Sequence, residues 1–454
     1  MTWKERRQVL VGASLLTLSA EPRLLHRRAR GRSPSPITMG EDLRGDLGYS
    51  RRPMSADPPE PKNDLRALAV LLLCVFLMIA GFGIIIPLLP FYAQSFDAPP
   101  WQIAALFSAF SLGQFFAEPF WGRMSDRIGR RRVLILTMAL GALGYVALAL
   151  APNLLAAFVI RLVTGFVSGN ISTIQGALAD ITPPEKRAGR MGILGSAFSM
   201  GFVCGPAIGG LLARPDLGTI GFHLPLYAAA GVGLLAAVAV AAFVRDVPRA
   251  TPQGPQPGRF QAAGEALSHP VIGRVLILSF IVVSGFAGIE ATYGLWTEAK
   301  FGWGPREIGF AFMVIGIIGA FAQGGLTGWL VRRSDEVSVL TGGLVLMFIG
   351  MVTQFASVNS AMAMIGFAFV CVGQSITFPN LSALISQAAP PDRQGEMLGI
   401  GMASNALARI GGPLYAGPMF SLVDPGAPFA LTAILIIPAL FIARQISRRR
   451  LKAA

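Results

Sequence analysis

Long apolar segments alternate with short polar ones through most of this chain. A membrane-spanning helix needs about 20 mostly apolar residues. Twelve segments meet that requirement: 66–93, 102–121, 133–151, 154–179, 189–213, 225–244, 271–296, 307–331, 337–357, 361–386, 396–421 and 427–443. The pattern therefore predicts an all-α membrane protein with twelve transmembrane helices.

Composition supports this class. Hydrophobic residues make up 53% of the chain and charged residues 14%, whereas soluble domains carry about a quarter charged residues. The net charge of +14 would fit a nucleic-acid-binding protein. However, the lysines and arginines lie in loops and tails between apolar segments, not on one polar face. We therefore expect the partner to be a lipid bilayer and not a nucleic acid.

The basic residues also predict an orientation. With a cytoplasmic N-terminus, the inner loops hold the arginines of 123–132, 186–190, 245–259, 332–333 and 393. The outer loops hold only Arg214, Lys300 and Arg306. Because cytoplasmic loops carry an excess of Lys and Arg, both termini are predicted to be cytoplasmic, in the cell (inner) membrane.

The predicted domains follow from these segments. Residues 1–64 form an Arg- and Pro-rich tail. The tail is predicted to be disordered. The alternatives are that the start codon is placed too early or that the segment is a cleaved signal. Two six-helix bundles occupy 65–245 and 270–445. Between them a proline-rich cytoplasmic linker covers 246–269, and a basic tail covers 446–454.

The two bundles repeat one another. Pro183–Gly192 introduces the fifth helix as Pro390–Gly399 introduces the eleventh, and Gly205-Pro206 is matched by Gly412-Pro413, 207 residues later. Such a parallel repeat is typical of transporter halves related by an axis along the membrane normal, with a substrate path between them.

Four stretches carry a family resemblance: Gly122–Arg131, Arg161–Gly169, Gly201–Gly210 and Gly83–Pro90. With them, residues 66–445 resemble the major facilitator superfamily, and in particular its twelve-helix drug:proton antiporters, such as the tetracycline-efflux proteins. The resemblance implies export by alternating access, with Asp126 meeting the cytoplasmic end of helix eleven when the inner gate closes. The chain departs from tetracycline exporters because the segment 76–81 holds no acidic residue.

Two groups of residues are candidates for gating and helix packing. The gating group is Gly122, Asp126, Arg127, Gly129, Arg130, Arg131 and Asp180, with Asp180 expected to pair with Arg130 or Arg131. The alternative is that these arginines only set topology. The helix-five antiporter motif is Gly201, Gly205, Pro206, Gly209 and Gly210. Its glycines also suit ordinary packing of small residues.

Charged residues within predicted spans are costly in lipid and therefore point to a partner or a cavity. Glu290 is the first candidate for proton coupling and Glu118 the second, with Arg161 and Arg409 as cationic neighbours. For Glu290 the alternatives are a fixed ion pair with Arg409 or exposure at the outer rim. For Glu118 the alternative is a structural partner of the gate loop, and for Arg161 it is a structural hydrogen bond to the first helix.

The remaining polar residues predict the character of the substrate. A mostly apolar cavity with a few amides suits a lipophilic or weakly polar molecule. The candidates that line it are Gln175, Tyr293, Trp296, Gln323, Gln374, Asn380 and Asn405. No metal-ligand spacing, nucleotide loop or catalytic constellation is found, so we expect no cofactor, no metal and no enzyme.

The sequence thus predicts a monomeric secondary transporter that exports small lipophilic compounds in exchange for protons. The alternative is a facilitator or proton symporter for a metabolite such as a sugar or an organic acid.

Overall fold

The computed structural model describes residues 65–244, 259–390 and 393–453. The predicted tail at 1–64 and most of the linker lie outside the described residues. Secondary structure in the described part is helical.

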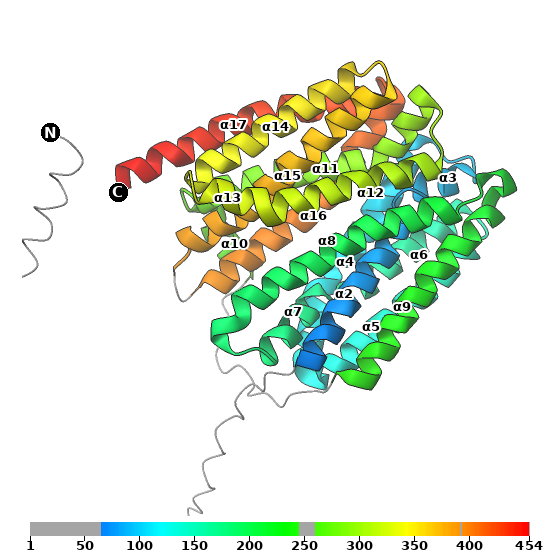
Figure 1. The fold of residues 1–454 in the computed structure, drawn as a ribbon, viewed down its shortest axis with the longest axis horizontal. Helices are drawn as coiled ribbons and strands as arrows, with labels where there is room; N and C mark the ends of the chain where they lie inside the picture. The colour runs from blue at the N-terminus through cyan, green and yellow to red at the C-terminus, as the bar shows by residue number, and fades with distance from the viewer. Residues whose placement is uncertain (1–64, 245–258, 391–392, 454) are drawn as a thin grey trace, which may run out of the picture. The chain divides into compact units, whose positions relative to one another are not determined.

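The first half of the chain contains the helices that precede the linker (Figure 1). They are α2 (Leu65–Ile85), α3 (Leu89–Gln94), α4 (Pro100–Ile128), α5 (Arg130–Ala149), α6 (Leu154–Val167), α7 (Ile171–Asp180), α8 (Pro184–Leu212), η1 (Pro215–Phe222) and α9 (His223–Phe243).

The second half contains the helices that follow. They are α10 (Arg259–Ser268), α11 (Ile272–Phe301), α12 (Pro305–Phe321), η2 (Ala322–Leu326), α13 (Thr327–Val331), α14 (Glu336–Ala356), α15 (Ser360–Ala388), α16 (Gln394–Leu422) and α17 (Ala427–Ala453). The segment 246–269 was expected to be a linker without helix, but its end forms α10. Ala262 and Ala266 of α10 are buried, and their spacing of four residues puts both on one face of the helix.

Each of the twelve predicted spans is mainly helical, with breaks at 86–88 and 168–170. Eleven helices of the described residues are long and apolar enough to cross a membrane. The predicted span 396–421 corresponds to α16, which is not among the eleven. This helix carries polar residues such as Asn405 and Arg409, and it packs between α11 and α4. A helix covered by protein does not need to be apolar all round.

The repeat seen in the sequence corresponds to a repeat in packing. A Cβ placed on Gly205 would lie 2.5 Å from the Ala80 carbonyl oxygen on α2. Gly412 is likewise in close contact with the backbone of α11, because a Cβ there would lie 2.9 Å from the Gly288 nitrogen. Thus α8 packs on α2 as α16 packs on α11, and glycine permits the close approach in both halves.

The helices end at two faces of the bundle. We call the end with the loops at Gly129, Thr182–Pro183 and Arg332–Asp335 the arginine face. The end with the loops at Ser95–Pro99, Gly302–Gly304 and Ser357–Asn359 is the opposite face.

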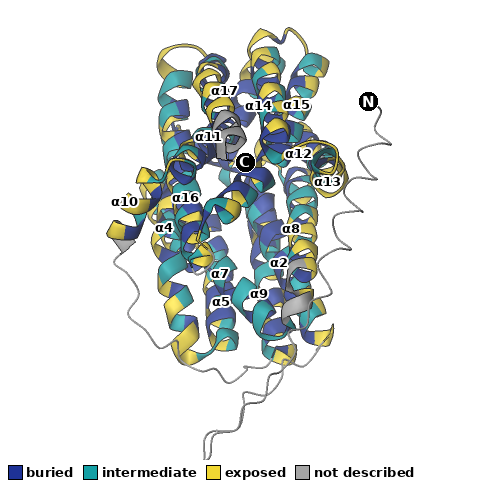
Figure 2. Ribbon diagram, turned by 90° about the vertical axis from the view of Figure 1, so that its left-hand side faces the viewer, coloured by how far each residue is buried: buried dark blue, intermediate teal, exposed yellow. Residues whose placement is uncertain are grey.

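The halves meet near the opposite face, through α8 against α12 and α4 against α16. A Cβ on Gly210 would lie 2.5 Å from the Pro305 carbonyl oxygen, and one on Gly417 would lie 2.9 Å from the Trp101 Cα. Toward the arginine face, a Cβ on Gly192 or Gly195 of α8 would touch nothing within 4 Å. Only 22% of the α8 span is buried, against 72% for α11 (Figure 2). In this conformation the contact between the halves is therefore concentrated at the opposite face.

Candidate functional site: a buried charge cluster and an arginine gate

Glu290 lies in the middle of the longest buried span. Helix α11 places it 4% exposed, and Arg409 of α16 approaches its Oε2 to 3.4 Å through Nη2. This contact is the ion pair predicted as the alternative to proton coupling. The other carboxylate oxygen, Oε1, has no hydrogen-bond partner among the described residues.

Arg161 brings a second positive charge from the other half. It is 1% exposed on α6, and its guanidinium carbon lies 4.4 Å from the centroid of the Phe110 ring. Its Nε and Nη1 have no hydrogen-bond partner among the described residues, and its charge interacts with Glu290 and Tyr145. We call Arg161, Glu290 and Arg409 the charge cluster. With all three ionised it carries one net positive charge.

Glu118 has a different setting. The fourth predicted span, 154–179, is interrupted between α6 and α7. The Glu118 carboxylate of α4 accepts a hydrogen bond from the Ser172 amide at 3.3 Å, in the first turn of α7. The free amides at a helix start are partly positive, so a carboxylate stabilises them. Glu118 is thus placed as a cap for the broken helix.

The gating candidates surround Arg130. Its Nε donates to Asp180 Oδ2 at 2.9 Å, which is the expected pair, and its Nη2 lies 3.4 Å from Asp126 Oδ1. Gly129 has φ 98°, a value that few residues other than glycine adopt, and it separates α4 from α5. Gly176 lies directly under the guanidinium, where a Cβ would collide with it.

The other members of the loop face outward or bind helix ends. Asp126 is 46% exposed on its side chain, and Arg127 is exposed. Arg131 donates to the Ala241 carbonyl at the end of α9. Gly122 was expected to let the helices approach one another. Instead a Cβ there would meet only the Ser172 Oγ, at 3.7 Å, so this glycine makes no close helix contact in this conformation.

One residue of this region escaped the sequence analysis. Arg190 of α8 is buried, and it donates to the Ile181 carbonyl at 3.2 Å and to Thr182 Oγ1 at 3.1 Å, at the end of α7. Its position at a predicted helix start gave it the appearance of a topology signal. The signal that could have identified its role is that a cation stabilises the C-terminal end of a helix.

The helix-five motif forms two contacts. Gly201, Gly205 and Gly209 face α2, whereas Gly210 faces α12 of the other half. A Cβ on Gly83 of α2 would lie 2.9 Å from the Pro206 ring. Tight packing within one half and across the halves is therefore carried by successive residues of one helix.

The predicted cavity residues are scattered. Tyr293 and Trp296 are buried in an aromatic core with Phe312, Phe367 and Phe429, and Asn380 is also buried, so these three do not line an open path here. Rings at this spacing on α11 pack inward because that helix is covered on most sides. Gln323 is exposed in η2, Gln175 and Gln374 are half-buried, and Asn405 accepts a hydrogen bond from Ser279 at 2.5 Å.

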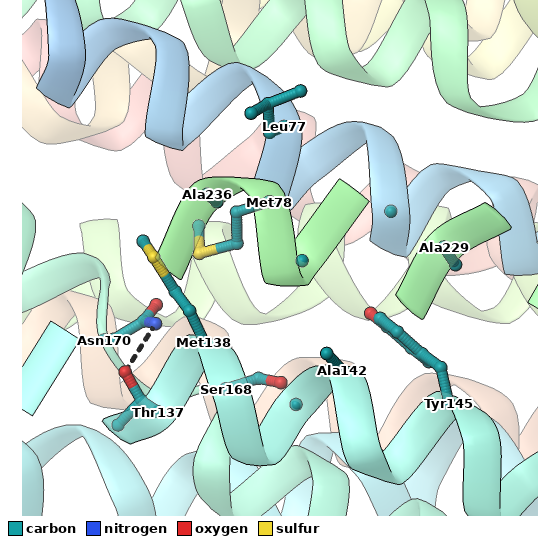
Figure 3. Close-up of a pocket in the computed structure, with 13 residues that line it drawn as sticks. Leu77, Met78, Thr137, Met138, Ala142, Tyr145, Ser168, Asn170, Ala229 and Ala236 are labelled. Atoms are coloured by element: carbon teal, nitrogen blue, oxygen red, sulfur yellow. Dashed lines mark hydrogen bonds between the residues drawn. The ribbon is translucent and has the colours of Figure 1, made fainter. Parts of the chain in front are cut away.

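A small pocket lies inside the first half, between α2, α5, α9 and the break that separates α6 from α7 (Figure 3). Asn170 donates to Thr137 Oγ1 at 3.0 Å on its wall, and Met78, Met138 and Tyr145 line the rest. No cluster of three or more His, Cys, Asp or Glu side chains suited to a metal ion occurs within the described residues.

The paired bundles, with charged residues buried between them, match a known family. The model of the Major Facilitator Superfamily matches residues 71–413, with a second match over 326–453. The chain belongs to the Major Facilitator Superfamily. The predicted fold class is thereby confirmed, and the chain is a multi-pass membrane transporter of small substrates and not an enzyme.

Two curated relatives cover most of this superfamily member. The Quinolone resistance protein NorA of Staphylococcus aureus (strain MRSA252) is 26% identical over 363 residues, covering 79% of this chain and 90% of NorA. The Tetracycline resistance protein, class C, of Escherichia coli is 30% identical over 366 residues, covering 78% and 90%.

Two solved structures share the fold. A bacterial homolog of the human lysosomal transporter Spinster, inward-facing and unoccupied, aligns with a TM-score of 0.73 at 18% identity, over 85% of this chain and 97% of the other. The human organic anion transporter MFSD10 aligns with a TM-score of 0.63 at 25% identity, over 85% and 100%.

Proposed function

We propose that this transporter exports small, mostly lipophilic compounds in exchange for protons, with Glu290 as the proton carrier. The observation that carries the proposal is the position of Glu290, buried between Arg409 of its own half and Arg161 of the other half. The names of the quinolone- and tetracycline-resistance relatives support export of drug-like compounds.

Protonation of Glu290 would remove its ion pair with Arg409 and so supply part of the energy of a conformational change. Two opposite charges about 4 Å apart attract by roughly 4 kcal/mol at an effective dielectric constant of ~20. Shifting an equilibrium from 1:99 to 99:1 takes about 5.5 kcal/mol. A proton on Glu290 removes its attraction to Arg409 and to Arg161 together, and with it a tie between the halves.

Alternating access supplies the movement. With the arginine face cytoplasmic, as the distribution of Lys and Arg indicates, this conformation is closed at the outer face and open toward the cytoplasm. Closing the inner side would bring the Gly122–Arg131 loop against α16. In this movement the exposed Asp126, near the end of α4, would meet the N-terminal end of α16.

The test is substrate-induced proton release from the purified protein in detergent, with norfloxacin, tetracycline and ethidium as probes. We expect release in the wild type and none in Glu290→Gln. Glu118→Gln should still release protons, because Glu118 acts as a cap. Glu307→Gln, at an exposed helix start, is the matched control. Release that persists in Glu290→Gln would remove Glu290 from the proton-carrying role.

A second candidate function is transport of an organic anion. Its support is the net positive charge of the charge cluster, since the buried Arg161 guanidinium and the half-buried Arg409 guanidinium interact with one carboxylate. An anionic carboxylate is a good ligand for guanidinium. The organic anion transporter MFSD10 shares the fold. Binding of benzoate, lost in Arg161→Gln, together with no proton release by the three cationic or zwitterionic probes, would favour this alternative.

A further inference from the structure

Polar atoms without partners gather in the second half, next to Glu290. Glu290 Oε1, the Tyr293 hydroxyl and both Nε2 and Oε1 of Gln354 have no hydrogen-bond partner among the described residues. Tyr293 and Gln354 are each 0% exposed. An unsatisfied buried polar group costs about 1–3 kcal/mol. Four such atoms in one region therefore require a physical explanation.

These side chains form a continuous series. The Gln354 amide of α14 lies near the Tyr293 hydroxyl of α11, but no hydrogen bond of acceptable geometry joins them. Cys371 of α15 lies near both Tyr293 and Glu290. Tyr293 follows Glu290 by three residues, nearly one helical turn nearer the opposite face. The order from the middle of the bundle outward is Glu290, Tyr293, Gln354.

The series ends at the opposite face. Gln354 lies in the last turn of α14, which ends at Ala356. Its carbonyl accepts a hydrogen bond from Ser357 Oγ at 2.8 Å, and the next residue, Val358, is 80% exposed. The series therefore runs inside the second half, between α11, α14 and α15, and not along the interface of the two halves.

The surroundings suit a narrow path for protons and not one for substrate. Phe367 stacks on Tyr293 with ring centroids 4.2 Å apart, and Phe312 packs against both rings. Arg409 of the same half and Arg161 of the other half place two positive charges near Glu290. Positive charge repels an approaching proton, as it does in selective pores.

We propose that Gln354 and Tyr293 form a proton path that loads Glu290 from the opposite face, separate from the substrate path between the halves. This inference rests on the proposed function, in which Glu290 carries the proton. Buried water bridges unsatisfied polar groups of this kind, with two to four hydrogen bonds each.

The transfer needs only O–H bonds to form and break. A proton from water at the opposite face joins the Tyr293 oxygen as the hydroxyl proton leaves, through a bridging water, for a Glu290 carboxylate oxygen. Tyr293 ends as it began, Glu290 becomes a neutral acid, and one proton has moved. Gln354 is a positioning residue: its amide holds the water by donating and accepting, and its own protonation does not change.

The test separates proton-driven transport from substrate exchange in proteoliposomes, with norfloxacin as the probe. Exchange of norfloxacin for norfloxacin needs no net proton movement. Positioned proton transfer contributes about 10²–10⁴-fold to a rate, so Tyr293→Phe should slow pH-driven transport by at least about tenfold and leave exchange unchanged. Tyr92→Phe is the matched control, because its buried hydroxyl already donates to the Leu148 carbonyl at 2.6 Å. Gln354→Met should behave as Tyr293→Phe does.

The outcomes distinguish the path from the proposed function. If Glu290→Gln loses pH-driven transport while Tyr293→Phe and Gln354→Met keep it, the path is wrong and the function stands. If Glu290→Gln also keeps it, the function itself fails.

A second measurement is independent of transport. Hydroxyl-radical labelling, with radicals generated in buried water, should modify Tyr293 despite its burial and leave Tyr92 unmodified. Equal, low labelling of both tyrosines would show that the path is dry and would overturn the inference.

Discussion

Gln94 donates a hydrogen bond of 2.7 Å to Glu298, and the two residues occupy equivalent places in the two halves. One turn deeper, a Cβ on Gly294 would lie 3.3 Å from the Pro90 ring. The members of each pair are 204 residues apart in the sequence. The same separation relates Ala80 and Ser284, which contact the matching glycines Gly205 of α8 and Gly412 of α16. The pseudo-twofold axis therefore passes between α3 and α11, and the halves are joined there by a polar bond.

Loss of this bond should favour opening at the opposite face. A hydrogen bond to a charged group contributes about 1.5–3 kcal/mol, so Gln94→Leu should shift the equilibrium toward opening by roughly tenfold or more. Spin labels on Asp216→Cys and Arg306→Cys, in a background lacking the native cysteines, would report a longer distance across this face. An unchanged distance distribution would show that the bond does not hold the face closed.

Closure of the same face also depends on glycine at 210. Because a Cβ there meets the Pro305 backbone, Gly210→Ala should force α8 and α12 apart. Overpacking of this kind costs about 1–3 kcal/mol. We expect slower transport and a lower melting temperature. Gly195→Ala on the same helix is the control, since a Cβ there has open space. Equal behaviour of the two variants would contradict the contact.

The contacts of Arg130 with Asp126 and Asp180 should depend on the geometry of its guanidinium group. Lysine cannot reproduce the directed contact of a guanidinium with a carboxylate, so Arg130→Lys should weaken the link between α5 and α7. Gly176→Ala should do the same, because it displaces the guanidinium. Both should reduce transport severalfold, whereas Arg132→Ala, which alters an exposed side chain, should not. The comparison is made by dye-efflux rate at equal amounts of protein in the membrane.

The packing of α10 against the start of α16 should depend on pH. Arg393 donates to Glu396 and lies 2.9 Å from Glu265, and this partner lowers the pKa of the exposed Glu265 carboxyl below its usual value of 4.5. A carboxyl with a lowered pKa stabilises the folded arrangement above its unfolded pKa, and this contribution disappears as pH falls through the folded pKa.

Hydrogen exchange of the α10 amides should therefore be constant from pH 8 to about 5, once corrected for intrinsic rates, and should rise below about pH 4.5. Glu265→Gln should remove that pH dependence. A pH-dependent rise of the same size in the variant would assign it to another group.

The periodicity of the chain determined the helices. Apolar segments of spanning length must lie in lipid, so the spans, the break between the halves and the Gly205/Gly412 repeat were all readable from residue order. Glycine spacing likewise predicted that α8 is a packing helix. Two charges at neighbouring helix ends predicted that Asp180 pairs with Arg130 or Arg131, and the structure selects Arg130.

Tertiary structure alone decided which side chains meet. Tyr293 and Trp296 were expected in a substrate cavity, but α11 is covered by neighbouring helices, so their rings form a core. The break between α6 and α7 gives the Glu118 carboxylate the Ser172 amide as a partner, a contact that residue order did not indicate. The contact of Gln94 with Glu298 joins residues far apart in the chain. Periodicity gives the face on which a residue lies, but the orientation of one helix against another sets its partner, because many distant contacts act together to fix that orientation.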